Sequence, residues 1–378
     1  MKKICYVVTK SITIKAFFIP QLKYLAQNGY SVSVICSPDD ELGAMLGDNI
    51  RFLPVEMPRG LSVLGSIKAI SKLKKIFKKE KFDLVQYSTP NASLYASIAS
   101  KKAGVKVRNY HLMGFRYLGA TGLIRFILKK LEKITCKKST SIECVSKSNL
   151  QLGVAEKIFK EKKATVVWNG SSGGLDLDRF DESKIELWRK EKRQELNIKE
   201  NDFVFGFVGR ITKDKGIREL ITAFKEVLKE SSAKLVIVGA FDQDNQLDED
   251  TLNELKNNKN IINVGQRADV EKYYPLFDVL VLPSYREGFG NVVIEAEAMG
   301  VPVIVSNIPG PIDAIKRGET GEVFESKNVS ELLSVMKSAK SFKEKGFNDN
   351  AKEYARRNFD SKTLSKYILE RKEKLLEK

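Results

Sequence analysis

The chain has 378 residues, of which 42% are hydrophobic and 30% are charged, and its formal net charge is +17. This length exceeds one ordinary hydrophobic core, so we expect two domains of a soluble globular protein. No stretch approaches the roughly 18 apolar residues of a membrane-spanning helix, and the N-terminal segment has too few for a secretory signal, so we expect a cytoplasmic protein.

Short β-branched segments alternate with helical segments along the first half of the chain. Helices are expected at 17–28, 66–81, 91–103 and 123–138, and strands at 3–9, 31–36, 83–87, 105–111, 141–145 and 164–168. Such alternation is typical of a parallel sheet that is covered by helices on both faces.

The alternation restarts after the turn-rich segment WNGSSGGLDLDRF at 168–180, with strands at 202–209, 233–239, 260–265 and 277–284 and a helix at 217–229. The fold class is therefore expected to be α/β, with two doubly wound, Rossmann-like parallel sheets facing across a cleft. We expect one domain over 1–168 and another over 169–360, with a C-terminal helix at 361–378 packing back on the first. Open sheets of this kind bind ligands at the carboxyl ends of their strands.

Cysteine spacing and the distribution of charge further limit which classes of protein the sequence fits. Cys5 and Cys36 lie in apolar strand-like runs, and Cys136 and Cys144 have neither a CxxC spacing nor a histidine partner, so we expect four reduced thiols. Residues 1–168 contain 30 Lys and Arg against 11 Asp and Glu, whereas the remainder contains 35 against 37. The first half therefore needs an anionic partner or surface.

Two cations follow the predicted strand that ends at Gly209. Arg210 and Lys215 flank a turn that opens a helix at about Gly216. Cations at the carboxyl end of a parallel strand are suited to hold a phosphate group, although loop cations are more often solvated. The segment is not a P-loop, and the chain contains no GxGxxG, which argues against a nicotinamide enzyme.

A second segment, YREGFGNVVIEAEAMGVPVIVS at 285–306, places carboxylates around a predicted helix N-terminus. Gly288, Phe289, Gly290 and Asn291 form the turn between Glu287 and the helix that contains Glu295. The helix start suits a diphosphate, so the two acids are expected to bind hydroxyl groups on either side of it, Glu295 a ribose and Glu287 a sugar. The alternative is that both are solvated acids favoured by the helix dipole.

These motifs resemble retaining glycosyltransferases of family 4, which have the GT-B fold. The resemblance rests on Gly209 and Arg210 with Lys215 and on the E-x7-E pair from Glu287 to Glu295, and the segments VSKS at 145–148 and VGQRADVEKYYPLFDVLVLPS at 264–284 fall in the family's order. Members with a similar junction often add sugars to lipid-linked precursors of capsule or O-antigen.

The resemblance implies a nucleotide-sugar donor, with UDP expected, and no metal or other cofactor. Arg210 and Lys215 would neutralise the leaving diphosphate, and the base would lie near Arg267. His111 falls where the family often has a histidine that touches the donor sugar; the alternative is an ordinary, partly buried histidine. The first loop departs from the family because it has Thr9, Lys10 and Ser11 in place of a glycine pair, and it is expected to face the acceptor.

The helices at 66–81 and 123–138 each combine an apolar stripe with a run of lysines. Each alone fits a core helix with a solvated basic face. Because each cation near an anionic leaflet contributes roughly 1 kcal/mol, the charge of the whole domain leads us to expect that it sits peripherally on the inner face of the plasma membrane, close to a lipid-linked acceptor.

Three other interpretations remain open. In the first two, the chain is an enzyme of the same fold that either transfers the sugar to a soluble acceptor or is a UDP-sugar epimerase. From a different class, the basic charge fits a nucleic-acid-binding protein, but interleaved aromatic residues and recognised DNA-binding patterns are missing, so we expect no nucleic-acid partner.

The DLD at 176–178 and DQD at 242–244 mimic a metal-binding DxD, and we expect neither to bind a metal.

Overall fold

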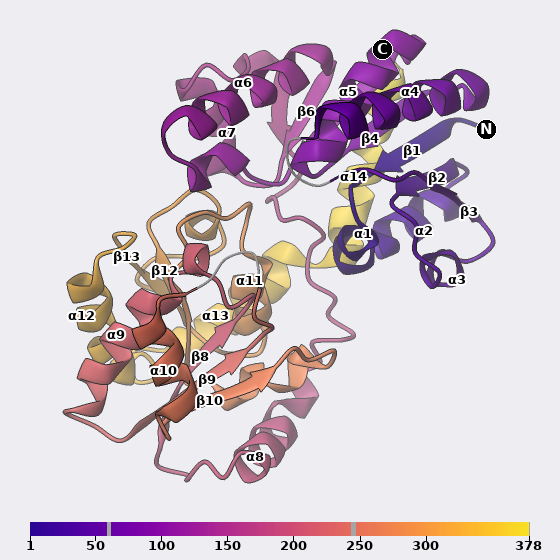
Figure 1. The fold of residues 1–378 in the computed structure, drawn as a ribbon. Coiled ribbons are helices and arrows are strands. Elements are labelled where there is room, and N and C mark those ends of the chain that lie inside the picture. The colour runs from indigo at the N-terminus through magenta and orange to yellow at the C-terminus, as the bar shows by residue number, and fades with distance from the viewer. Residues whose placement is uncertain (59–61, 243–246, 378) are drawn as a thin grey trace. The chain divides into compact units, whose positions relative to one another are not determined.

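The computed structural model describes residues 1–58, 62–242 and 247–377 (Figure 1). The chain forms two compact units, one of residues 1–174 with 361–378 and one of residues 175–360. The first ends after Gly174 because the Ser171 amide donates to the Val145 carbonyl, whereas the Leu175 amide donates to the Phe359 carbonyl of the second unit.

The first unit contains a parallel sheet of seven strands in the order β3-β2-β1-β4-β5-β6-β7. The strands are β1 (Lys3–Val7), β2 (Ser31–Cys36), β3 (Ile50–Pro54), β4 (Leu84–Tyr87), β5 (Val107–Leu112), β6 (Ser141–Cys144) and β7 (Ala164–Val166). The helices are α1 (Ser11–Phe17), α2 (Ile19–Gln27), α3 (Leu42–Leu46), α4 (Val63–Glu80), α5 (Pro90–Ala103), α6 (Gly122–Lys138), α7 (Lys147–Ala155) and α14 (Ser361–Leu376).

The second unit contains a parallel sheet of six strands in the order β10-β9-β8-β11-β12-β13. The strands are β8 (Phe203–Val208), β9 (Ala233–Val238), β10 (Ile261–Gly265), β11 (Val279–Leu282), β12 (Val303–Ser306) and β13 (Gly321–Phe324). The helices are α8 (Ile185–Glu195), α9 (Ile217–Leu228), α10 (Glu249–Asn257), α11 (Asn291–Ala298), α12 (Val329–Ser338) and α13 (Phe347–Phe359).

The expected fold class is confirmed, because both sheets are parallel and doubly wound. The central strands of each sheet are buried on both faces, as their uniform apolar runs predict. The sequence pattern misses the edge strands β3 and β13, because both are partly exposed and lack a continuous apolar run. All four cysteines are buried free thiols, as expected.

Helix α14 belongs to the first unit, and a buried ion pair attaches it to the sheet. Lys372 is 1% exposed, and its Nζ lies 2.8 Å from Glu143 Oε2 in β6 and 2.6 Å from Gln86 Oε1 in β4. Trp168, which follows β7, stacks on Tyr367 of α14 with 5.7 Å between ring centroids. None of the helices among the described residues is long and apolar enough to cross a membrane.

Candidate functional site

The carboxyl ends of β8 and β11 are neighbours at the point where the strand order of the second sheet reverses. Strands β9 and β10 lie on one side of this point and β12 and β13 on the other, and Phe205 of β8 pairs with Val279 of β11. Doubly wound sheets bind their ligands at such a point. The two loops that the sequence singles out, after β8 and after β11, therefore leave the sheet side by side.

Backbone contacts join these two loops. Gly216 precedes α9 with a φ of +70°, and a Cβ atom at this position would lie 2.1 Å from the Pro283 carbonyl oxygen. The Tyr285 amide donates to the Asp214 carbonyl over 2.8 Å. Arg286 Nη2 lies 2.7 Å from Asp214 Oδ2. The loops therefore fix each other's position, and no larger residue fits at Gly216.

The junction of the two loops brings Lys215 and Glu287 together. Lys215 Nζ lies 2.5 Å from Glu287 Oε1, and the buried Ser284 hydroxyl donates to the same oxygen over 2.8 Å. The two side chains are 18% and 14% exposed. An ammonium and a carboxylate are thus held together at the carboxyl edge of the sheet, and both are partly exposed.

Asp214 was not identified from the sequence, although it lies between the two cations of that motif. Burial raises the pKa of Asp214, but the hydrogen bond from Thr212 and the charge of Arg286 outweigh burial, so the pKa is lowered. Asp214 is therefore ionised and paired with Arg286. The sequence offered one signal for Asp214 and Arg286, since they directly precede the motif residues Lys215 and Glu287.

The glycine turn leads into α11 as predicted. Gly290 has a φ of +89° and precedes the first helical residue, Asn291. The Phe289 ring is buried and lies 5.4 Å from the Phe359 ring, which anchors the turn to α13. A Cβ atom on Gly310 would lie 2.8 Å from the Gly288 carbonyl oxygen, so the backbone is closely packed here. The positive end of the helix dipole is consequently held beside the loop that carries Lys215.

Glu295 lies one turn into α11 and has a buried partner. The Tyr274 hydroxyl donates to Glu295 Oε2 over 2.5 Å. Burial raises the pKa of Glu295, and the hydrogen bond from Tyr274 opposes that rise. Tyr274 fixes the orientation of the carboxyl group, and the sequence gave no sign of this because 21 residues separate the pair.

Arg210 and Arg267 leave the same edge of the sheet on separate loops. Arg210 is half exposed and pairs with Asp242 after β9, and Gly209 before it donates its amide to Val238 over 3.0 Å. Arg267 is exposed after β10, with its guanidinium 5.9 Å from the centre of the Tyr273 ring. Both arginines therefore stay apart from the pair of Lys215 and Glu287.

The first of the two DxD segments, at 176–178, forms a turn. Asp176 accepts the amide of Asp178 over 3.1 Å and so closes a turn. In the second segment, 242–244, only Asp242 is among the described residues, and the rest of that segment lies outside them.

His111 lies in the first unit near the carboxyl end of β5, beside Glu143 of β6. Its Nδ1 is 3.2 Å from the Ser88 hydroxyl, and its ring packs edge-on against Phe18. Burial lowers the pKa of His111 to about 4, so the imidazole is neutral at pH 7. It lines a cavity of about 20 Å³, room for roughly one water molecule.

The first loop lies at the corresponding point of the first sheet, where the order reverses between β1 and β4. Thr9 Oγ1 lies 2.9 Å from Thr89 Oγ1, which connects the ends of these two strands. Ser11 begins α1 and its hydroxyl donates to Asp39 over 2.5 Å. Lys10 precedes α1 and is half-buried.

Two family models match the chain, one in each half. "Glycosyl transferase 4-like" matches residues 3–146, and "Glycosyl transferases group 1" matches residues 189–358. The second match contains Arg210, Lys215, Glu287 and Glu295.

Relatives extend the match over most of the chain. The sequence is 35% identical to the capsular polysaccharide biosynthesis glycosyltransferase CapM of Staphylococcus aureus, over 86% of this chain and 84% of CapM. It is 27% identical to the UDP-Gal:alpha-D-GlcNAc-diphosphoundecaprenol alpha-1,3-galactosyltransferase of Escherichia coli, over 84% and 82% of the two chains. The structure is similar to that of Anabaena HepE in complex with UDP, with a TM-score of 0.78, 19% identity, and 99% and 100% of the chains covered.

Proposed function

Because this chain belongs to the glycosyltransferases and has the GT-B fold, we propose that it is a retaining enzyme that transfers a sugar from a UDP-sugar to a lipid-linked glycan. The product would extend an envelope polysaccharide of capsule or O-antigen type. The observation that carries the proposal is the contact of Lys215 with Glu287 where the strand order reverses. The donor and acceptor classes are supported by the name of the Escherichia coli relative.

The donor diphosphate would bind between Lys215 and the start of α11. The Lys215 ammonium is already held by Glu287, so it needs no reorganisation to accept a second anionic partner. Arg210 is exposed and can turn from Asp242 towards the same phosphates. Glu295, oriented by Tyr274, would accept hydrogen bonds from the ribose hydroxyls.

In the transfer step, the bond between the anomeric carbon and the donor phosphate oxygen breaks as the acceptor hydroxyl attacks from the same face. The acceptor oxygen forms the new bond to that carbon, and its proton passes to the departing phosphate oxygen. Lys215 and Arg210 neutralise the charge that develops on the diphosphate, a role that a metal ion fills in other enzymes. Glu287, held by Ser284, would bind the hydroxyls of the donor sugar.

His111 would contact the donor sugar as a neutral hydrogen-bonding group. Its pKa of about 4 keeps it uncharged over the physiological range, so it can both donate and accept. Its Nδ1 is occupied by Ser88, which leaves Nε2 as the atom for the sugar.

The first unit carries an apolar surface that suits docking to a membrane. Leu123, Ile124 and Phe126 at the start of α6 are 72%, 59% and 55% exposed. At the start of α4, the side chains of Val63, Leu64 and Ile67 are exposed as well. Some apolar residues of α6 are therefore exposed and do not belong to the core. This differs from the alternative that α6 is an ordinary core helix with a solvated basic face.

The topology puts this apolar surface at the carboxyl edge of the first sheet, which is also the edge at which His111 lies. Each of α4 and α6 follows a strand and precedes the next one, so in a parallel sheet both helices begin at the carboxyl edge. Along the same helices, lysines offer positive charge to an anionic leaflet, at about 1 kcal/mol each. Lys130 lies over the Phe126 ring at 4.3 Å. The first unit would therefore hold the enzyme at the membrane that contains a lipid-linked acceptor.

A transfer assay tests the proposed reaction. The protein is incubated with a panel of UDP-sugars and an undecaprenyl-diphosphate-linked acceptor, and the anomeric configuration of the product is read by NMR. Transfer with retained configuration supports the proposal. Transfer to a soluble sugar alone, or conversion of the UDP-sugar to its epimer, would support one of the alternative enzymes, and inversion of configuration would refute retention.

Co-sedimentation tests the membrane surface. Wild-type protein should bind vesicles of 3:1 phosphatidylcholine and phosphatidylglycerol, and Leu123→Ser with Phe126→Ser should bind them at least tenfold more weakly. The matched control is Leu187→Ser with Phe241→Ser, which changes the same residue types in the second unit, where they are 50% and 49% exposed. Equal binding by the two variants would contradict the assigned surface.

A further inference from the structure

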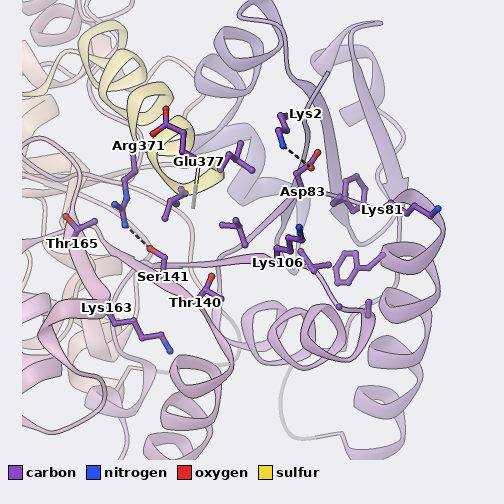
Figure 2. A pocket seen from close by; sticks show the side chains of 18 of the residues that line it. Lys2, Lys81, Asp83, Lys106, Thr140, Ser141, Lys163, Thr165, Arg371 and Glu377 are labelled. Atoms are coloured by element: carbon purple, nitrogen blue, oxygen red, sulfur yellow. Dashed lines mark hydrogen bonds and ion pairs between the residues drawn. The ribbon is translucent and has the colours of Figure 1, made fainter.

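A large hollow lies at the amino-terminal edge of the first sheet, opposite to the edge at which His111 lies. Its volume is about 1080 Å³, and its wall includes the first residues of β5, β6 and β7 and the residues before β1 and β4. The end of α4 and the last turns of α14 complete it. Figure 2 shows Lys81 of the α4 end on one side of this basic hollow and Arg371 of α14 on the other.

The basic hollow gathers cations with few partners. Its wall includes seven Lys and Arg residues and only two acids, Asp83 and Glu377. Asp83 is already engaged, since it accepts the Lys3 amide over 2.8 Å and lies 3.6 Å from Lys2 Nζ. Among the residues that the structure describes, five lysines of the wall have no ion-pair partner: Lys78, Lys81, Lys106, Lys162 and Lys163.

Helix dipoles explain only part of this charge. The amino edge of a doubly wound sheet collects helix C-termini, which favour cations, and this accounts for Lys78 and Lys81 at the end of α4. Lys106 precedes β5, Lys162 lies in a short 3-10 helix before β7, and Arg371 lies within α14. Lys106 and Arg371 do not lie in the last turn of a helix, and the 3-10 helix that contains Lys162 has only three residues, so its dipole is small.

Lys163, which lines the basic hollow, is fixed in place close to other cations. Lys163 Nζ donates to the Cys136 carbonyl over 2.5 Å, which fixes the ammonium at the end of α6. Burial lowers the pKa of Lys163, and the neighbouring charges of Arg108 and Lys101 lower it further. A bound anion would relieve this repulsion.

We propose that the basic hollow binds a phosphate-bearing anion, at a site separate from the donor site. Phosphate groups carry several acceptor oxygens and more than one negative charge, which matches point-charge ammonium donors approaching from several directions. Arg371 adds a guanidinium whose Nη2 is fixed by Ser141 over 2.8 Å. The phosphate would belong to a lipid headgroup or to a soluble molecule, and the chemistry of recognition is the same.

Calorimetry with inorganic pyrophosphate and vesicle co-sedimentation together test the site. The hollow variant is Lys106→Glu with Lys162→Glu, both exposed, and the matched control is Lys343→Glu with Lys345→Glu, two exposed lysines of the second unit. All titrations are repeated on Lys215→Ala, so that pyrophosphate in the proposed donor site is recognised separately. Circular dichroism and thermal melting confirm that each variant is folded.

If the source is a soluble phosphate, the hollow variant should bind pyrophosphate at least tenfold more weakly than the control, with unchanged vesicle binding. If the source is a headgroup, the hollow variant should bind 3:1 phosphatidylcholine and phosphatidylglycerol vesicles at least tenfold more weakly, and pyrophosphate should release the wild type from them. The proposal is overturned if the hollow variant matches the control with both probes, or if the wild type binds neither. Because Lys215→Ala removes only the donor site, a failure here leaves the proposed function standing.

Discussion

Replacing Lys372 with methionine should destabilise the first unit by leaving a buried carboxylate without its counter-ion. Lys372 and Glu143 are 1% and 3% exposed, and the ammonium lies 3.0 and 2.8 Å from the two carboxylate oxygens. Methionine keeps the length of the lysine stem, so the packing of α14 changes little. The loss is therefore chiefly electrostatic.

The structure bounds the size of the effect. Removing one partner of a buried ion pair costs about 3–5 kcal/mol. Gln86 keeps a partner, because its Oε1 also accepts from Asn109 over 2.9 Å, so no second polar group is stranded. Arg371 Nε lies 3.5 Å from Glu143 and offsets part of the lost charge, which places the expected loss near the lower end, about 3 kcal/mol.

Tryptophan fluorescence can follow this unit alone. The chain has two tryptophans: Trp168 stacks on Tyr367 of α14, and Trp188 lies in α8 of the second unit. In a Trp188→Phe background, urea unfolding monitored at Trp168 therefore reports on the docking of α14 and on the first sheet. A unit-specific probe is needed because a chain with two domains need not unfold in one step.

A second substitution separates the ion pair from packing. Adding Glu143→Gln to Lys372→Met removes the stranded charge and should recover most of the lost free energy of unfolding, because replacing both partners of a buried pair is often nearly neutral. A loss of less than about 1 kcal/mol in the single variant, or no recovery in the double variant, would show that this pair does not hold α14 in place.

Three further predictions concern the proposed donor site and a buried acid. Lys215→Ala should lower kcat/KM for transfer at least 100-fold, about 3 kcal/mol, with unchanged thermal stability; near-normal turnover would remove the role assigned to this cation. Tyr274→Phe should raise the donor KM about tenfold with little change in kcat, because a hydrogen bond to a charged group contributes about 1.5–3 kcal/mol and here orients Glu295; an equal fall in kcat would point to the transition state instead. Burial raises the pKa of Glu132 to about 7, so the wild type loses stability as the pH rises from the unfolded carboxyl value through 7, and Glu132→Gln should gain up to about 3 kcal/mol relative to it over that window; urea titrations at pH 5 and 8 that give the same difference would contradict this.

The local pattern of the sequence sufficed for most elements of both sheets. Runs such as AKLVIV of β9 and VLVL of β11 are strands because β-branched side chains fill a sheet that is covered on both faces. The glycine turn before α11 was equally local, since the left-handed conformation of Gly290 is one that glycine adopts without steric cost. Edge strand β3 escaped this reasoning because a half-exposed strand has no continuous apolar run.

The site was predicted as a set of motif residues, without their contacts. The sequence placed Lys215 and Glu287 each after a strand, which is a local property. That the two side chains meet follows from β8 and β11 being neighbours, and Ser284 and Asp214 become relevant only once the loops are joined. Strand order is not encoded in any single segment, so sequence periodicity alone could not supply these partners.

The sequence by itself determined two alternating α/β halves, a basic first half, and a glycine turn between two acids, because each depends on residues within a few positions of one another. The tertiary structure decided which charges meet. Lys372 neutralises Glu143, 229 residues away, and the lysines of the basic hollow share one wall, because folding brings distant strand starts and the C-terminal helix to the same edge of a sheet. Charge interactions act through space, so they were fixed only when the chain had folded.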